Sequence, residues 1–202
     1  LEYCCTVPTG CANGNDDNLS SASPGAGGLV GIASAEAHTT ANVNSEAKIG
    51  NNAQITLLKN ADTGATGALQ AIADQNTLAN LLIQTNSYGL ISGAGSEGTN
   101  DVNANSTVRF GNSADVKAAN LSANASNHFT KADIGTNVNG ESAGAITVAG
   151  AAVRTDLAMN SLVVVEDNVT LIVKDDSPAG GGIALSTFND IFYYDSVAYK
   201  GG

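Results

Sequence analysis

The stretch NSEAKIGNNAQI, residues 44–55, decides the fold because its pattern returns twice along the chain. Counting 61 residues on gives NSTVRFGNSADV, residues 105–116, and a further 55 give NSLVVVEDNVTL, residues 160–171. Each unit of a repeat array is a module that buries its apolar face by stacking on its neighbours, so the repeat predicts a stacked architecture. The match extends upstream without a gap, and the aligned 28-residue blocks are 28–55, 89–116 and 144–171.

Apolar and polar residues alternate with period two inside each block. This alternation is typical of strands with one buried face, whereas a helix would need a period of 3.6. We therefore expect the aligned apolar positions to point into one core. Two such columns are Ile49, Phe110, Val165 and Ile55, Val116, Leu171.

Three short segments, GNN at 50–52, GNS at 111–113 and EDN at 166–168, separate the strands at matching positions. Gly, Asn and Asp tolerate positive φ, so these segments are predicted to be turns. They suit the hairpins of a β-sandwich or the stacked corners of a β-solenoid, where an Asn amide can bond to its equivalent one coil above. The chain holds only nine aromatic residues and no Trp, which favours a narrow coil over a sandwich with bulky filling.

We therefore predict an all-β fold, a parallel β-helix (β-solenoid) built from about three two-coil repeats, with an N-terminal extension and a C-terminal aromatic cap. The insert 67–86 suits either a helix, with Leu78, Leu81 and Leu82 on one face, or another coil, and its place between strand blocks favours the coil. The expected divisions are a cysteine-bearing extension over 1–27, the solenoid repeat domain over 28–174 and a cap or subunit-contact segment over 175–202.

The formal net charge is −11, and no cluster of Lys and Arg occurs in the sequence. Nucleic acid is therefore not an expected partner, because its binding requires the neutralisation of phosphates. No apolar run approaches the roughly 20 residues that a membrane-spanning helix needs. The chain begins at Leu1 without an initiator Met or a signal peptide, so we expect a processed product or a piece of something longer.

Three cysteines, Cys4, Cys5 and Cys11, are disulfide candidates. They lack the C-x-x-C spacing and the fourth ligand of a metal site, so a loop closed by Cys11 with either Cys4 or Cys5 is the better interpretation. The remaining thiol is then free or used between chains. Asp16 and Asp17 could supply oxygen ligands to a structural calcium ion, although ordinary turn propensity accounts for them as well.

The sequence has no H-E-x-x-H pattern of a metalloprotease and no P-loop pattern. Neither His38 nor His128 has a neighbouring Cys or second His in the sequence, so both are expected to be solvated. A carbohydrate-active β-helix enzyme, such as a polysaccharide lyase or hydrolase, would group Asp, Lys and Arg on one sheet face, and the outward columns show no such group. An ice-binding surface would need a regular outward Thr ladder, which is also missing. We therefore predict no catalytic and no cofactor-binding residue.

The third block is apolar on both faces, because Leu162, Val164 and Ile172 replace polar residues of the earlier blocks. Such a strand is normally covered on both faces, here by the aromatic tail or by a neighbouring subunit. An open solenoid end also templates further pairing, so we expect the chain to join copies of itself head to tail. The predicted subunit contacts are Leu162, Val164, Ile172, Phe188, Phe192, Tyr193, Tyr194 and Tyr199.

The stretches GGLVGIASAEA (27–37), GLISGAG (89–95) and VRFGNSADVKAANLSA (108–123) resemble the β-strand repeats of giant bacterial surface proteins, the filamentous-haemagglutinin-like and leukotoxin-like filamentous adhesins. The resemblance covers roughly 28–174. It implies an extracellular, right-handed parallel β-helix at the cell surface that serves as a stalk, adhesin or fibre without a catalytic centre. Glycans on a host or neighbouring cell would then be its external partners.

Overall fold

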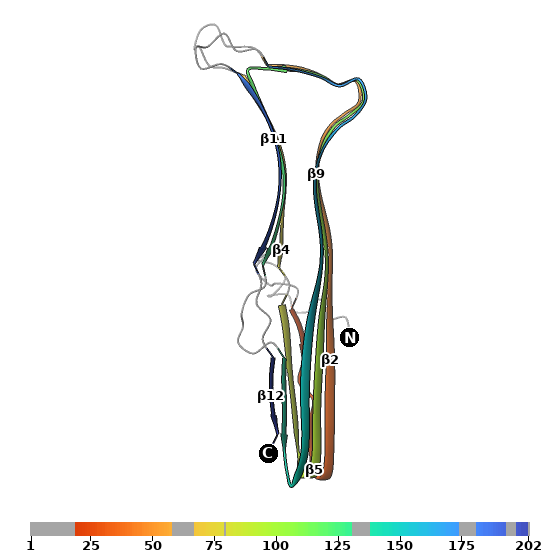
Figure 1. The fold of residues 1–202 in the computed structure, drawn as a ribbon. Helices are drawn as coiled ribbons and strands as arrows, with labels where there is room; N and C mark the ends of the chain where they lie inside the picture. Colours follow the sequence, from red (N-terminus) through yellow and green to blue (C-terminus); the bar gives the residue numbers. More distant parts are fainter. Residues whose placement is uncertain are drawn as a thin grey trace, which may run out of the picture.

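The computed structural model describes residues 19–57, 67–78, 80–130, 138–173, 181–192 and 197–201. All regular structure in these ranges is β-strand, and every strand pair is parallel (Figure 1). The prediction of an all-β fold with parallel sheets, as in a β-helix or solenoid, is therefore confirmed. Within the same ranges, no helix is long and apolar enough to cross a bilayer.

The strands form three sheets, which we call the front, corner and back sheets. The front sheet holds β1 (Leu19–Ala22), β2 (Gly25–Ile49), β5 (Asn80–Phe110), β8 (Val138–Ala143), β9 (Ile146–Val165) and β12 (Val197–Gly201). The corner sheet holds β3 (Gln54–Thr56), β6 (Asp115–Ala118) and β10 (Thr170–Val173). The back sheet holds β4 (Ala68–Leu78), β7 (Asn120–Thr130) and β11 (Gly182–Phe192).

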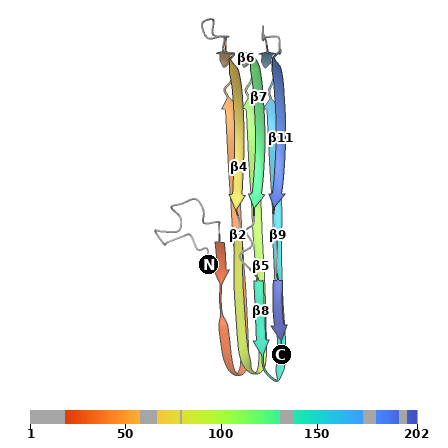
Figure 2. The same ribbon diagram turned by 90° about the vertical axis from the view of Figure 1, so that its left-hand side faces the viewer.

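The chain passes through the sheets in the same order each time, which divides it into layers. The first layer is β1 to β4, the second is β5 to β7 and the third is β8 to β11, and the layers lie side by side in Figure 2. β12 pairs with β8 and so lies beyond the third layer. Each layer is a long, flattened loop. The front sheet bends at one end of the molecule, so that β2 and β9 run opposite the back sheet and also opposite β12 (Figure 1).

The register between layers is the one that the sequence repeat predicts. Asn44 pairs with Asn105 and Asn105 with Asn160, at separations of 61 and 55 residues. The two core columns follow the same register, as Ile49, Phe110, Val165 and Ile55, Val116, Leu171. The three blocks therefore superpose as direct neighbours in the sheets.

The expected number of coils per repeat is wrong. Because equivalent residues of consecutive blocks are adjacent strand partners, each repeat contributes one layer and not two. The insert 67–86 was predicted to form another coil, and it does form strands, β4 and the start of β5. However, β4 lies in the back sheet of the first layer, where it pairs with β7, so it closes that layer. A layer takes up about sixty residues because the chain runs along the front sheet, turns at the corner sheet and runs back along the back sheet.

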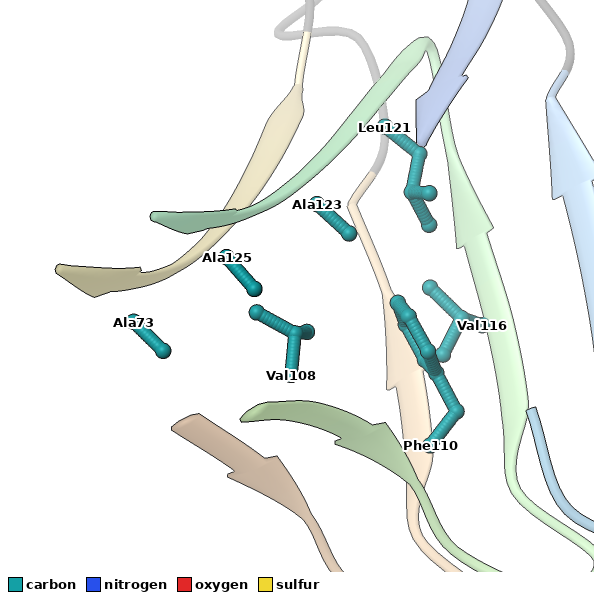
Figure 3. Packing of buried hydrophobic residues seen from close by; sticks show 7 residues of the cluster. All are labelled: Ala73, Val108, Phe110, Val116, Leu121, Ala123 and Ala125. Carbon is teal, nitrogen blue, oxygen red and sulfur yellow. The ribbon is translucent and has the colours of Figure 1, made fainter. Parts of the chain in front are cut away.

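The largest core cluster lies between the front, corner and back sheets of the second layer. Phe110 and Val116 are completely buried there, and Figure 3 shows their side chains beside one another. Ala73 and Ala125, on the back sheet, lie across from Val108 (Figure 3). These alanines allow the two sheets to approach closely, which explains how a chain with few large residues fills its interior.

The corners between front and corner sheets carry the turns that the sequence predicts. Asn52, Ser113 and Asn168, which occupy the same position in the three layers, have φ values of 58°, 59° and 57°. Backbone bonds join one corner to the next, because the Asn52 N–H donates to the Asn112 carbonyl (2.8 Å) and the Ser113 N–H to the Asp167 carbonyl (3.0 Å). Stacked corners, and not hairpins, are therefore what these segments form.

The tail differs from the expected cap. β11 pairs with β7 along its whole length and β12 pairs with β8, so both strands extend the sheets as further parallel members. A strand that joins a sheet leaves its own outer edge open, whereas a cap would close that edge. The described residues of the tail therefore cover only the β8 part of the third layer and leave β9 and β10 uncovered.

Replacing Phe110 by Ala should destabilise the fold by about 3–5 kcal/mol, because the substitution removes buried surface and leaves a cavity. Phe192, whose residue is 71% exposed, offers a matched control, and Phe192→Ala should have a much smaller effect. Urea unfolding of both variants measures the difference. Equal losses of stability would contradict the assignment of Phe110 to the core.

Candidate functional site: the open edges of the sheets

Two sides of the stack carry strands with only one partner. Among the described residues, β2 pairs with β5 alone, and β3 and β4 pair with β6 and β7 alone; we call this side the first edge. On the other side β9, β10 and β11 pair only with β5, β6 and β7, and these strands form the last edge. Figure 2 shows the two edges on opposite sides of the stack. Each edge presents a row of unpaired backbone N–H and C=O groups, which can template another strand.

The structure places the predicted contact residues on the strands of the last edge but does not gather them under a cover. Leu162 is 53% exposed on β9, and Ile172 is 42% exposed on β10. Phe188 and Phe192 are exposed on β11, while Val164 is partly buried. Tyr199 lies on β12, opposite Gly140 in the register, and Tyr193 and Tyr194 lie outside the described residues. Of the two covers predicted for Leu162, Val164 and Ile172, the described part of the aromatic tail does not supply one, because β11 occupies the back sheet. The other, a neighbouring subunit, stays a prediction.

A ladder of three asparagines crosses the outer face of the front sheet. Asn105 Nδ2 donates to Asn44 Oδ1, and Asn160 Nδ2 donates to Asn105 Oδ1, both at 3.0 Å. The sequence predicted amide stacking at the corners, whereas this ladder of side chains lies on strands β2, β5 and β9. At the corner, the Asn112 Oδ1 instead accepts a bond from the Asp167 backbone N–H (3.1 Å).

Buried polar side chains join the front sheet to the back sheet. Asn127, fully buried on β7, donates from Nδ2 to the Asn160 carbonyl (2.7 Å), Ser161 Oγ (3.0 Å) and Asn189 Oδ1 (3.1 Å). Its Oδ1 accepts a bond from Ser106 Oγ (2.7 Å). Buried polar groups that find all their partners fix one arrangement of the layers. Sequence reasoning missed these residues because an inward polar residue looks like a break in the alternation.

An ion-pair chain links the three layers near the corner. Arg109 donates from Nε to Glu46 Oε1 (3.3 Å) and from Nη1 to Glu166 Oε1 (2.7 Å). The bond from Arg109 lowers the pKa of Glu166, with further lowering by the Asn112 backbone N–H and by the charges of Arg109 and Lys48, against a smaller opposing effect of desolvation. The same bond to Glu166 raises the pKa of Arg109. Glu166 therefore ties the third layer to the second.

Both histidines keep side chains that are partly exposed to solvent, as expected, but each also lies near a carboxylate of another layer. His38 Nε2 lies 3.3 Å from Asp101 Oδ2. His128 lies between the first and third layers, with Nε2 3.4 Å from Asp74 Oδ1 and Nδ1 3.8 Å from Asp190 Oδ2. The sequence separation of these partners hid the contacts.

Metal-ligating side chains do not gather within the part of the chain that the structure describes: no group of three or more His, Cys, Asp or Glu residues there could hold an ion. The calcium candidates Asp16 and Asp17 lie outside the described residues, as do the disulfide candidates Cys4, Cys5 and Cys11. These predictions therefore stay predictions.

A shallow groove of about 440 Å³ crosses the outer face of the front sheet. Its lining includes the strand partners Glu36 and Glu97, together with the small residues Ser34, Gly95 and Gly150. Its floor is formed by residues with little or no side chain, and the two carboxylates are its only charged groups. This groove offers a concave polar surface with paired acids.

Large apolar side chains are also exposed at the bend within the front sheet. The bend carries apolar residues in every layer. Those of the second layer are exposed although this layer has a stacked neighbour on each side, so the addition of further layers would not bury them. An exposed apolar patch of this kind marks a contact surface. Its residues are Leu29, Val30, Ile32, Tyr88, Leu90, Ile91, Ile146 and Val148.

Comparisons of the chain with protein-family models, with curated proteins and with solved structures found no match. The likeness to filamentous adhesins therefore stays a resemblance of sequence pattern.

Acidification should loosen the third layer. The pKa of Glu166 lies below its ordinary value of 4.5 in the fold, so its carboxylate stabilises the folded chain above that value and the contribution is lost as the pH falls through the lowered pKa. We expect Glu166→Gln to reduce the free energy of unfolding at pH 7 and to reduce its dependence on pH below 4.5. Urea unfolding across this pH range is the measurement.

Glu36→Gln is the matched control, since Glu36 has no ion-pair partner among the described residues. This variant should not lower stability at pH 7. If Glu166→Gln unfolds like the unaltered chain at every pH, the bond between Arg109 and Glu166 contributes nothing to the stacking of layers.

Proposed function

We propose that this chain is a β-solenoid that acts as a non-catalytic extracellular structural protein, either a subunit of a cell-surface fibre or a segment of an adhesin stalk. One observation carries the proposal: the stack ends on both sides in open parallel edges whose residue columns correspond. In both settings the edges are covered by more layers of the same kind. In a fibre those layers belong to another copy of the chain, and in a stalk they belong to the same protein.

The contact between layers inside the chain is the model for the contact between copies. β5 is paired on both sides over most of its length, and its inward side chains Val108 and Phe110 are completely buried. In contrast, Val165, which stands in the Phe110 column on the last edge, is 45% exposed. Another layer added to this edge would bury Val165 as the third layer buries Phe110, which supplies a hydrophobic driving force.

The two edges are different surfaces, which determines the kind of assembly. A contact between the first edge of one copy and the last edge of another is heterologous and leaves one open edge of each kind at the ends. The contact therefore repeats without closing and produces a filament. Backbone pairing provides much of the affinity in such strand addition, and the side-chain columns provide the specificity.

Full-length protein should assemble into unbranched filaments, with size increasing with concentration, as measured by light scattering and negative-stain microscopy. Truncation after Lys174 removes β11 and β12 and with them the back sheet of the last edge, so this variant should assemble much less. Truncation after Phe192 keeps β11 and is the control that should retain assembly.

A full-length chain that stays monomeric at high concentration would rule out the fibre and leave the stalk segment. A chain truncated after Lys174 that assembles like the full chain would show that the back sheet takes no part in the joint. The unfolding midpoint of each truncated chain must be measured alongside, because a variant that fails to fold also fails to assemble.

A carbohydrate-active β-helix enzyme is the second candidate, and the groove that holds Glu36 and Glu97 is the observation in its favour. Two carboxylates across a groove are the usual apparatus of glycoside hydrolysis. However, Glu36 and Glu97 are strand partners in adjacent layers of a flat face, and the third member of their column is Ala152. Nothing on this face encloses a sugar ring.

We expect the chain to release no reducing ends and no unsaturated products from acidic or neutral polysaccharides. Glu36→Gln and Glu97→Gln should assemble like the unaltered chain. Product release that disappears in Glu97→Gln would overturn the structural function in favour of the enzyme.

A further inference from the structure

The asparagine ladder ends in a donor at one edge and in an acceptor at the other. Each amide in the ladder donates toward the first layer, so Asn44 Nδ2 has no partner on the first edge within the described residues. At the last edge Asn160 donates its own Nδ2 to Asn105, and its Oδ1 has no partner there. The two ends therefore complement one another, whereas two first edges would oppose donors and two last edges would oppose acceptors.

The corners restrict the register in which the edges can meet. A shift by one residue would turn every inward side chain of the added strand outward. A shift by two residues would keep the faces but displace the turn at Asn52 from the turn at Asn168. These turns lie in register through the three layers and are joined by backbone bonds, so only one register continues them.

In that register the side-chain columns also continue. Asn44 of the added copy meets Asn160, and Ile49 meets Val165. In the corner sheet Ile55 meets Leu171, so each apolar inward position is again covered by an apolar one. The same shift thus satisfies the ladder, the corner and the core along β2, β3 and β4. Residues 22–26 of the added copy would take the place beside β8 that β12 already holds, so one of these two segments must be displaced at the joint.

We propose that the first edge of one copy adds to the last edge of another in the register that places Asn44 on Asn160, so that the asparagine ladder runs unbroken through the joint. This inference rests on the proposed function, because it names the partner surface and the register of the same assembly. A filament built in this way is polar, since each joint uses one β2 edge and one β9 edge and the two ends of the filament therefore differ.

Cysteine pairing tests the register. In a chain with Cys4, Cys5 and Cys11 replaced by Ser, one variant carries Asn42→Cys and a second carries Ala158→Cys. Residues 42 and 158 occupy one outward column and are exposed. In the proposed joint they are neighbours across parallel strands, about 4.8 Å apart and within the Cα range of a disulfide.

The mixture of the two variants should form disulfide-linked dimers on mild oxidation, and neither variant should do so alone. Glu36→Cys mixed with Ala158→Cys is the off-register control, since position 36 is about 20 Å along the strand from position 42. Asn44→Cys mixed with Ala158→Cys reports a shift by two residues. The register would be overturned if dimers formed best in either of these two mixtures. It would also be overturned if the chains assembled and no mixture gave disulfide-linked dimers.

Light scattering of the same mixtures separates this inference from the proposed function. Chains that assemble but pair in another register contradict only the inference. If the unaltered chain, the serine-substituted parent and the cysteine variants all remain monomeric, the fibre itself is contradicted.

A second pair of variants tests the ladder. Asn44→Asp keeps an oxygen that can accept the bond from Asn105 Nδ2 but removes the free donor and sets a carboxylate against Asn160 Oδ1. Because the loss of one hydrogen bond on this solvent-exposed face costs roughly a factor of five in affinity, the concentration needed for assembly should rise about fivefold. Asn42→Asp makes the same charge change one column away and should leave that concentration nearly unchanged.

Urea unfolding should give both aspartate variants similar midpoints at concentrations where the chain is monomeric. Equal effects of Asn44→Asp and Asn42→Asp on assembly would attribute the loss to charge alone and would contradict the role of the ladder in the joint.

Discussion

Parallel, in-register pairing of β5 with β2 on one side and with β9 on the other is the constraint on which the rest of the structure depends. It sets each side chain directly beside its equivalent in the next layer, so the residues of each column must be able to pack against or bond to one another. Inside, the columns meet this demand with Ala, Val and Ile or with amides that bond to one another. Outside, Arg109 shares a column with Lys48 and is neutralised by Glu46 and Glu166.

The same constraint explains why small residues dominate. A layer that folds back on itself has room for only two rows of inward side chains between its front and back sheets. Where the rows hold Ala73, Ala123 and Ala125, the sheets approach closely, and where they widen, Phe110 and Leu121 fill the space. The polar contacts of Asn127 lie at another point of the same interior and orient the back sheet against the front sheet.

The repeated blocks, their register and their corners could be predicted from the sequence because three copies with alternating residues carry that information directly. The positive φ values at Asn52, Ser113 and Asn168 follow from turn chemistry that is visible in the residues. The size of a layer could not be predicted, because alternation within a block does not say whether the following segment starts another coil or returns along the same one. β11 was not recognised as a sheet strand, since its aromatic residues match no earlier block and its register with β7 depends on loop lengths.

The candidate site was predicted in part. The apolar character of Leu162 and Ile172 predicted a cover over the outer face of the third block. Both residues are exposed in the single chain, so the cover by a neighbouring subunit stays a prediction. The donor and acceptor ends of the ladder were beyond sequence reasoning, because they depend on the orientation of three amides. Both histidine contacts were missed for a related reason, since residues more than fifty positions apart become neighbours only after layers stack.

The connections between sheets differ in length from layer to layer while the columns do not. Eleven residues separate Thr56 from Ala68 in the first layer, one separates Ala118 from Asn120 in the second, and eight separate Val173 from Gly182 in the third. Insertions at these seams are therefore absorbed without disturbing any strand partner. A layer behaves as an interchangeable module: duplicating or deleting the segment that encodes one would lengthen or shorten the stack by a single step and leave its two ends chemically the same. The height of such a molecule is set by the number of copies of the module, and not by a limit of the fold.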